Sequence, residues 1–252
     1  MMVKSFRRVA AIVLAGAAAL CLAGCGGGDQ AKKYIIATDT TFAPFEFEKD
    51  GQRVGIDMDL IAAIAEDQGF EYEMQVLGFD AAVQALEGDQ VDAVIAGCSI
   101  TEERKLKFDF SDPYYDSKVA MGVKADNTTV NSYEDLRGKT VAVKKGTEGA
   151  NFAEKIKKQY DFTTKSFDDS AFMYEDVKTG NSIACFEDFP VLAYGVQQNN
   201  GLKIVGEQQQ GSSYGFAVNK GKNAELLEMF NKGLANLKAN GKYQEIVDKY
   251  TK

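Results

Sequence analysis

A carboxylate and two aromatic rings follow the first apolar segment suited to a strand. Tyr34–Ala37 predicts the strand, Asp39 comes just after it, and Phe42 and Phe45 flank Pro44 in the loop beyond. Ligands of α/β proteins bind at the carboxyl ends of strands. We therefore expect Asp39 and Phe42 to contact a ligand, whereas Phe45 should anchor the loop as a core aromatic.

Arg104 is the second residue with the chemistry of a binding group. It follows the predicted strand Val91–Ile95, in a short helix that begins at Thr101. A guanidinium group can grip a carboxylate through two parallel hydrogen bonds, which a lysine cannot do. The competing interpretation is an ion pair on the helix surface with Glu102 or Glu103.

Small residues precede this arginine. If the stretch continues the strand, alternate residues share a face, so Gly97 and Ser99 line the site while Cys98 points into the core. The alternative is a simple turn at the strand end. Phe79, at the mouth of the predicted strand Tyr72–Leu77, offers an apolar wall or, alternatively, a core aromatic.

Two further charges stand at strand ends later in the chain. Lys144 closes the predicted strand Thr140–Lys144, and Asp188 directly follows the predicted strand Ser182–Phe186. An isolated aspartate before a proline, here Pro190, is more often a turn residue. Both interpretations of Asp188 stay open at this point.

Segments suited to strands and to helices alternate along the chain and must position these groups. Helical spacing of apolar residues followed by Gly69 predicts a helix over 57–67. Further strands are expected at Val119–Lys124 and Ser213–Val218, and further helices at 80–87, Gly149–Tyr160, Asn223–Asn240 and Lys242–Tyr250. The alternation indicates βα units around a parallel sheet, and it pauses at Asp109–Lys118 before a second α/β set begins.

Histidine and cysteine content excludes several kinds of site. The chain has no histidine, which excludes histidine-dependent triads and histidine-ligated zinc. Of its four cysteines, Cys98 and Cys185 fall in the folded part, without the spacing of a metal site. We expect two buried thiols; a disulfide between them is the alternative. No metal or cofactor is predicted.

The first residues predict export and a lipid anchor. Lys4, Arg7 and Arg8 precede the apolar run Val9–Leu22, which is too short for a comfortable membrane span. The run ends in LAGC, which resembles the lipobox of bacterial lipoproteins. We therefore expect a signal peptide over 1–24, a lipidated Cys25 and a flexible leash over 25–32. The alternative is an ordinary signal peptide with an incidental cysteine.

The net charge excludes one class of partner. The chain carries −8, and removing the three positive leader residues gives −8 − 3 = −11. Such an acidic protein is unsuited to nucleic acid, whose phosphates need Lys and Arg.

Three segments carry a resemblance that covers nearly the whole mature chain. ATDTTFAPFEF at 37–47, VGIDMDLIAAIAEDQG at 54–69 and AGCSITEERK at 96–105 resemble the amino-acid family of bacterial extracellular solute-binding proteins, especially its glutamine receptors. The resemblance implies an α/β, two-lobe periplasmic-binding-protein fold with two interlobe crossings and a ligand cleft between the lobes. It places the crossings near Tyr114–Ser117 and Gln210–Tyr214. Lobe one would then be 33–115 with 215–252, and lobe two 119–210.

The same resemblance assigns roles within the cleft. Arg104, helped by Gly97 and Ser99, would hold the α-carboxylate of an amino acid, and Asp188 its α-ammonium. Asp39 and Lys144 match the positions that meet a carboxamide, which indicates glutamine. Phe42 and Phe79 would form the apolar walls. The implied protein is a monomer that delivers a free L-amino acid to an ABC permease and its ATPase subunits.

Two residues depart from the glutamine-receptor pattern. Glu187 replaces a histidine, and Glu148, at the start of the helix 149–160, replaces a glycine. If both carboxylates point inward, a basic amino acid becomes the alternative ligand. Two other functions remain: an enzyme similar to cyclohexadienyl dehydratases, with Glu148 and Glu187 as general acids, and a receptor read by a separate sensor.

Overall fold

The computed structural model describes residues 32–252. The predicted signal peptide, Cys25 and all but the last residue of the predicted leash lie outside these residues. Over the described range, no helix has the length and apolar character needed to cross a membrane.

The first sheet within this range has the strand order β4-β1-β5-β12-β6. Its strands are β1 (Lys33–Thr38), β4 (Glu71–Val76), β5 (Ala93–Val94), β6 (Phe108–Phe110) and β12 (Ala217–Asn219). β1 is parallel to β4 and β5, whereas β12 runs antiparallel to both of its neighbours. Its helices are α1 (Ile56–Gln68), α2 (Phe79–Glu87), α3 (Glu102–Lys105), α7 (Ala224–Ala239) and α8 (Lys242–Thr251), and a hairpin of β2 (Phe47–Lys49) and β3 (Gln52–Val54) precedes α1.

The second sheet has the order β11-β7-β10-β8-β9. Its strands are β7 (Lys118–Lys124), β8 (Thr140–Lys144), β9 (Thr163–Phe167), β10 (Ala184–Asp188) and β11 (Leu202–Gln210). β8 is parallel to β9 and β10, and β7 is antiparallel to β10 and β11. The accompanying helices are a 3₁₀ turn, η1 (Tyr133–Leu136), and α4 (Glu148–Tyr160), α5 (Ser170–Lys178) and α6 (Phe189–Gln197).

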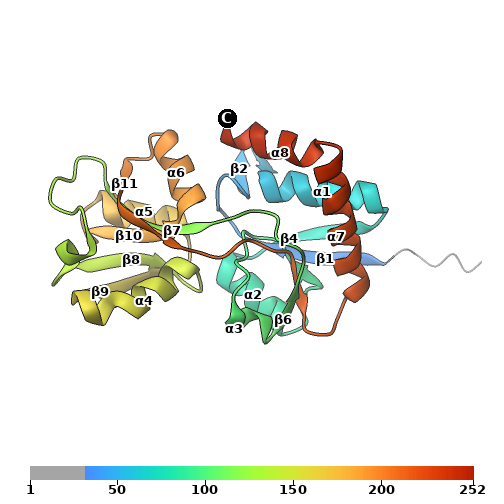
Figure 1. Cartoon of the computed structure of the whole chain (residues 1–252), viewed down its shortest axis with the longest axis horizontal. Coiled ribbons are helices and arrows are strands. Elements are labelled where there is room, and N and C mark those ends of the chain that lie inside the picture. The colour runs from blue at the N-terminus through green and yellow to red at the C-terminus, as the bar shows by residue number, and fades with distance from the viewer. Residues whose placement is uncertain (1–31) are drawn as a thin grey trace, which may run out of the picture. The chain divides into compact units, whose positions relative to one another are not determined.

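Two sheets, each with its own helices, make two lobes (Figure 1). The chain leaves the first sheet after β6 and enters the second at β7; it returns after β11 to complete the first sheet with β12. β7 and β11 pair with each other, and Gln210 lies opposite Lys118 where the crossings begin. The apolar clusters follow the two lobes, except that the main cluster of the first lobe also includes Val191 of α6.

Local sequence explains why the long elements form. The helix predicted from apolar spacing is α1, and Gly69 ends it in the left-handed conformation (φ 72°), with its N–H donated to the Ala65 carbonyl. In β8 the residues Val141–Lys144 are all buried, as expected of a strand covered on both faces.

The prediction of parallel sheets was wrong in part, and two of the missed strands share a cause. Both sheets are mixed, because β7 and β12 are antiparallel insertions. β9 and β11 are the edge strands of the second sheet, and their polar sequences, TTKSF and LKIVGEQQQ, hide them from an apolar-run search. The predicted strand Val91–Ile95 shortens to β5, whereas β12 begins four residues later than the predicted strand Ser213–Val218 and ends one residue after it.

Helix α6 was missed because of its proline. Pro190 lies in the first turn of α6, where proline breaks no backbone hydrogen bond. The sequence predicted Asp188 beyond the end of the strand, but Asp188 is the last residue of β10. It also caps α6 at its N-terminus in an extended conformation.

Candidate functional site

The loop after β5 carries two of the predicted residues, but not as a strand. β5 ends at Val94, and Gly97 adopts φ +53°, so the alternation argument for Gly97 and Ser99 was wrong. The Gly97 N–H donates to Asp57 Oδ2 at 2.8 Å. A Cβ at Gly97 would lie 2.4 Å from the Phe42 ring, so only glycine fits beside this wall.

Arg104 points across the interface between the lobes. Thr101 caps α3 by accepting the Arg104 N–H at 3.2 Å. The guanidinium donates to the Ser99 carbonyl at 2.8 Å and to the Gly146 carbonyl, in the other lobe, at 2.9 Å. It also lies over the Phe79 ring, 5.1 Å from the centroid. The surface-pair alternative was wrong, because Glu102 pairs with Lys105 instead.

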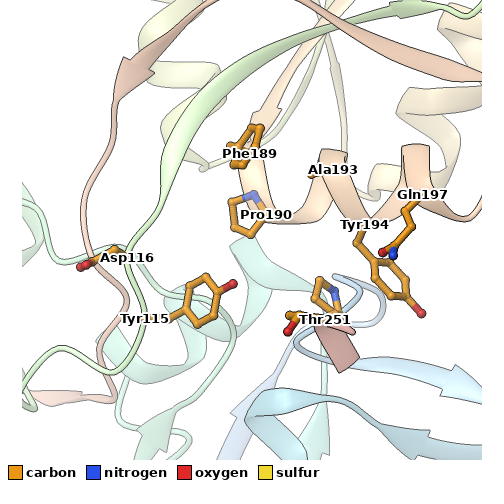
Figure 2. Close-up of a pocket in the computed structure, with 9 residues that line it drawn as sticks. Tyr115, Asp116, Phe189, Pro190, Ala193, Tyr194, Gln197 and Thr251 are labelled. Atoms are coloured by element: carbon orange, nitrogen blue, oxygen red, sulfur yellow. The ribbon is translucent and has the colours of Figure 1, made fainter. Parts of the chain in front are cut away.

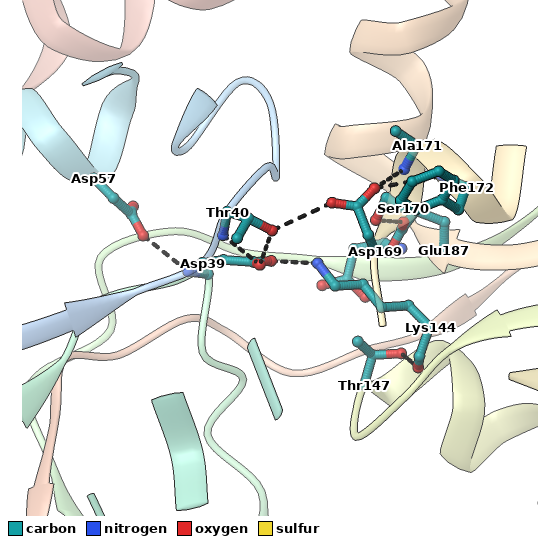
Figure 3. A network of polar contacts seen from close by, with 12 residues as sticks. Asp39, Thr40, Asp57, Lys144, Thr147, Asp169, Ser170, Ala171, Phe172 and Glu187 are labelled. Atoms are coloured by element: carbon teal, nitrogen blue, oxygen red, sulfur yellow. Dashed lines mark hydrogen bonds and ion pairs between the residues drawn. The ribbon is translucent and has the colours of Figure 1, made fainter. Parts of the chain in front are cut away.

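Asp39 and Lys144 form an ion pair that joins the lobes (Figure 3). Both side chains are only 1% exposed. Burial disfavours the charge on Lys144, but the negative charges of Asp39 and Glu187 outweigh it, so the pKa of Lys144 is raised. The other Asp39 oxygen accepts the Thr40 N–H at 2.6 Å. Lys144 is therefore held in its charged form beside Asp39.

Asp188 and Glu187 are buried side by side in the second lobe. Burial, reinforced by the Glu187 charge, raises the pKa of Asp188 to about 7. Its carboxylate accepts a hydrogen bond from the hydroxyl of Tyr214, a residue of the returning crossing. Glu187 accepts hydrogen bonds from Ser170 Oγ at 2.8 Å and the Tyr174 hydroxyl at 3.2 Å, and burial raises its pKa.

A small cavity of about 10 Å³ lies where these groups meet. Its lining combines both lobes: Phe42, Phe79, Ala96, Gly97, Ser99, Arg104, Lys144, Thr147, Glu148 and Asp188. Eight of the ten predicted residues are among them. The other two do not line the cavity. Asp39 contacts the lining residue Lys144, whereas Glu187 faces α5 and accepts hydrogen bonds from Ser170 and Tyr174.

Two lining residues were not predicted. Thr147 caps α4 by accepting the Ala150 N–H, and a threonine just before a helix could have marked it. Ala96 has no side chain that sequence reasoning would select. Glu148 is the first residue of α4, at the cavity wall, so its predicted position at a helix start holds.

Polar contacts across the cleft hold the lobes together beyond the central pair. Lys145 pairs with Asp80 at 2.8 Å, and Thr40 donates to Asp169 at 3.2 Å (Figure 3). A volume of about 10 Å³ accommodates one water molecule at most, so any larger ligand requires the lobes to separate.

A larger groove of about 470 Å³ lies beside the first crossing (Figure 2). It is lined by Pro44 and Thr251 of the first lobe, by Tyr115 and Asp116 of the crossing, and by α6 residues Phe189, Pro190, Ala193, Tyr194 and Gln197. None of the predicted site residues lines it. Since its walls belong to both lobes, its width must change when the lobes move.

Cys98 and Cys185 are free, buried thiols in separate lobes, as predicted. Burial raises the pKa of both. Over residues 32–252 no cluster of three or more potential metal ligands is present.

An arginine from one lobe and a buried aspartate from the other face one cavity, so the site can receive a ligand that carries both charges. This arrangement defines a two-lobe solute-binding protein. A family model for the bacterial extracellular solute-binding proteins, family 3, matches residues 34–252, and the chain belongs to that family.

Several similar proteins are named as amino-acid-binding proteins. An arginine-binding periplasmic protein of Mannheimia haemolytica is 34% identical over 235 residues, covering 91% of this chain and 95% of that protein. An ancestral arginine-binding protein, 41% identical, has been solved with arginine (TM-score 0.81; 87% of this chain and 98% of that one) and with glutamine (0.79; 86% and 97%). The second substrate-binding domain of Lactococcus lactis GlnP, in an open conformation, is 41% identical, with TM-score 0.62 over 88% of this chain and 96% of that one.

Proposed function

We propose that this chain is the lipid-anchored receptor of an amino-acid ABC importer and that its ligand is L-glutamine. Family membership already supports amino-acid binding and association with an ABC transporter. The lipid anchor, the ligand and the site residues are the new parts of the proposal.

The observation that carries the proposal is the convergence of Arg104 and Asp188 on one cavity from opposite lobes. Arg104 would bind the α-carboxylate, since its guanidinium donors now rest on two backbone carbonyls that a carboxylate can replace. Asp188 would bind the α-ammonium, whose charge compensates a carboxylate that is buried without a cation.

The Asp39–Lys144 pair supports glutamine as the ligand. A carboxamide has an NH₂ donor for Asp39 and a C=O acceptor for Lys144, so insertion between them leaves neither charge unpaired. Lys144 would repel a cationic ligand side chain, and Asp39 would repel an anionic one. Sites built on such hydrogen bonds reject ligands that leave their buried groups unsatisfied.

A basic amino acid is the second candidate. Four carboxylates surround the site (Asp39, Glu148, Glu187 and Asp188) against two cations (Lys144 and Arg104). The excess negative charge favours a cationic ligand, and the curated relative from Mannheimia haemolytica is named for arginine. Glu187 weakens this alternative, because Ser170 and Tyr174 already satisfy it away from the cavity.

Hinge closure supplies the mechanism. Ligand entry separates the lobes about the paired crossings, and closure brings Arg104 and Asp188 onto the ligand. The higher TM-scores with the ligand-bound ancestral protein than with the open GlnP domain, at equal identity, support assigning the present arrangement to the closed form. The closed receptor then presents both lobes to the permease, while separate ATPase subunits supply the free energy.

The decisive experiment measures ligand binding directly. The compact unit Ala31–Lys252 is unfolded, dialysed, refolded and titrated with all twenty amino acids by thermal shift and calorimetry. A ligand at a thousand times its Kd adds ~4 kcal/mol, a rise of several degrees in Tm. A shift with glutamine is expected; a shift only with arginine, lysine or histidine would replace it with the second candidate. No shift at all would direct attention to prephenate dehydration or to a sensor partner.

The anchor has a separate test. Cys25→Ala in the full chain should release the protein from the membrane fraction, whereas Cys98→Ala should leave it there, because Cys98 lies in the core. Membrane retention of the Cys25 variant would contradict lipidation at that residue.

A further inference from the structure

Behind the Gly97 loop lie two carboxyl groups that the proposed binding mechanism does not use. Glu46, between the Pro44 loop and β2, and Asp57, in the first turn of α1, are both 0% exposed. Their backbones lie side by side, because the Asp57 N–H donates to the Phe45 carbonyl at 2.9 Å, and the charge of Asp57 adds to the rise in the pKa of Glu46. Two carboxyl groups hydrogen-bond only if one of them carries a proton.

The partners of the two groups differ sharply. Asp57 Oδ2 accepts the Gly97 N–H at 2.8 Å and the Tyr114 hydroxyl at 2.8 Å. Among the residues that the structure describes, no donor serves either oxygen of Glu46 or the second oxygen of Asp57. An ionised Glu46 would therefore be a buried charge without a donor, which is strongly unfavourable.

From this geometry we propose that Glu46 is protonated at neutral pH and donates to Asp57, and that the pair positions the Gly97 loop. The hydrogen bond from Glu46 completes the set of donors around Asp57. Asp57 therefore stays ionised and accepts the hydrogen bonds from Gly97 and Tyr114. Because Gly97 packs against the Phe42 ring at φ +53°, a shift of its N–H also displaces the cavity wall. Glu46 and Asp57 are positioning residues, since neither lines the cavity.

The surrounding charges agree with this assignment. Burial raises the pKa of Glu46 well above its ordinary value, and the charges of Asp57 and Asp39 add to the rise, while Lys144 opposes it. Burial also raises the pKa of Asp57, but only to about 6, because hydrogen bonds from Gly97 and Tyr114 favour its ionised form. The groups that face the pair are therefore Asp39, Lys144 and Tyr114.

The sign of the pH effect follows from the raised pKa of Glu46. A raised folded-state pKa contributes stability below the unfolded value, and this stability is lost as pH rises through the folded value. Glu46→Gln keeps a donor toward Asp57 but has no proton to lose. The difference in Tm between Glu46→Gln and the unaltered protein should therefore grow in favour of the variant as pH rises from about 5 to about 9.

The experiment combines three measurements on refolded Ala31–Lys252. Thermal unfolding across pH compares Glu46→Gln with the exposed control Glu48→Gln, whose difference from the unaltered protein should not vary with pH. Infrared difference spectra between the unaltered protein and Glu46→Gln at pH 7 should contain a protonated-carboxyl component that belongs to Glu46, whereas the signal of Asp188 cancels because both proteins carry Asp188. The Gly97 amide resonance should keep its position in Glu46→Gln and move in Glu46→Ala.

The consequence for binding rests on the proposed function. Glutamine affinity should fall about tenfold in Glu46→Ala and stay within about threefold in Glu46→Gln. A pH-independent Tm difference, or the absence of that protonated-carboxyl component from the difference spectrum, would overturn the proton assignment. An unmoved Gly97 resonance in Glu46→Ala would overturn the positioning role. Since these readouts need no ligand, failure of the glutamine proposal would leave them interpretable.

Discussion

The two ends of the cleft contain the same kinds of charge in different balance. At one end Asp39 and Lys144 neutralise each other across the lobes. At the other end Arg104 donates to backbone carbonyls, and Asp188 accepts from a tyrosine hydroxyl while the charge of its neighbour Glu187 repels it. The charges at the first end are balanced without a ligand. The charges at the second end are balanced only when a ligand brings a carboxylate to Arg104 and an ammonium group to Asp188.

This difference divides affinity from selectivity. The unbalanced end gains most from the α-carboxylate and α-ammonium that every amino acid carries, so it should set how tightly any of them binds. The balanced end must open its ion pair for the ligand side chain, so it should set which one binds. Four predictions test this division, from the largest effect to the smallest.

Arg104→Ala should weaken binding of every amino acid by ~2–4 kcal/mol, or roughly thirtyfold to a thousandfold. The α-carboxylate would be buried without its cation. Calorimetry with glutamine and arginine measures the loss. The neighbouring Lys105→Ala removes an exposed pair of the same helix and should change affinity less than about twofold. Equal effects of the two variants would contradict the assignment of Arg104 to the α-carboxylate.

Lys144→Met should alter selectivity more than affinity. Without the ammonium group, Asp39 is left to attract cations, so glutamine should lose ~2 kcal/mol while arginine loses less or gains. The ratio of the two Kd values is the measurement. Lys145→Met, in which an adjacent exposed lysine loses its pair with Asp80, is the matched control and should leave the ratio unchanged. A parallel loss for both ligands would mean that the ends of the cleft are not separate.

Affinity should fall as pH drops below about 7, by up to about tenfold per pH unit. In the closed arrangement burial raises the pKa of Asp188 to about 7, and a proton bound there must leave before the carboxylate can pair with an ammonium group. Titrations in buffers of different ionisation heat should detect proton release at pH 7. Affinity that does not depend on pH between about 5.5 and 8 would show that Asp188 does not bind the α-ammonium group of the ligand.

Tyr214→Phe should cost ~1 kcal/mol of binding free energy and move the pH profile upward. The hydroxyl of Tyr214 lowers the pKa of Asp188, so its removal raises that pKa further. Tyr250→Phe is the control, since its hydroxyl donates to Asp59 at 2.9 Å, away from the cleft. If the two variants have the same profile, the hinge tyrosine has no influence on Asp188.

The sequence predicted the buried elements well and the polar ones poorly. Strands such as β1 and β8 are apolar runs, and α1 carries helical spacing with a glycine stop, so each was found. Edge strands β9 and β11 expose polar side chains, and no apolar pattern marks them. The residues of a strand likewise do not reveal whether it pairs in parallel or antiparallel with its neighbours, which is why the mixed sheets were missed.

For the site, residue type was enough to select candidates but not their partners. Arg104 and Asp39 could be chosen by their chemistry, yet the contact between Arg104 and the Gly146 carbonyl depends on how two lobes meet. The Gly97 loop shows the same limit from another direction. Its left-handed turn is fixed by Asp57, forty positions away in the chain.

The place of β12 in the first sheet has a consequence for how the protein is made. β12 lies between β5 and β6, so β6 cannot join its sheet until residues 217–219 have been synthesised. The second sheet uses only residues 118–210 and is complete before then. During synthesis the second lobe can therefore fold first, while the sheet of the first lobe remains incomplete, with an open edge that is prone to aggregation.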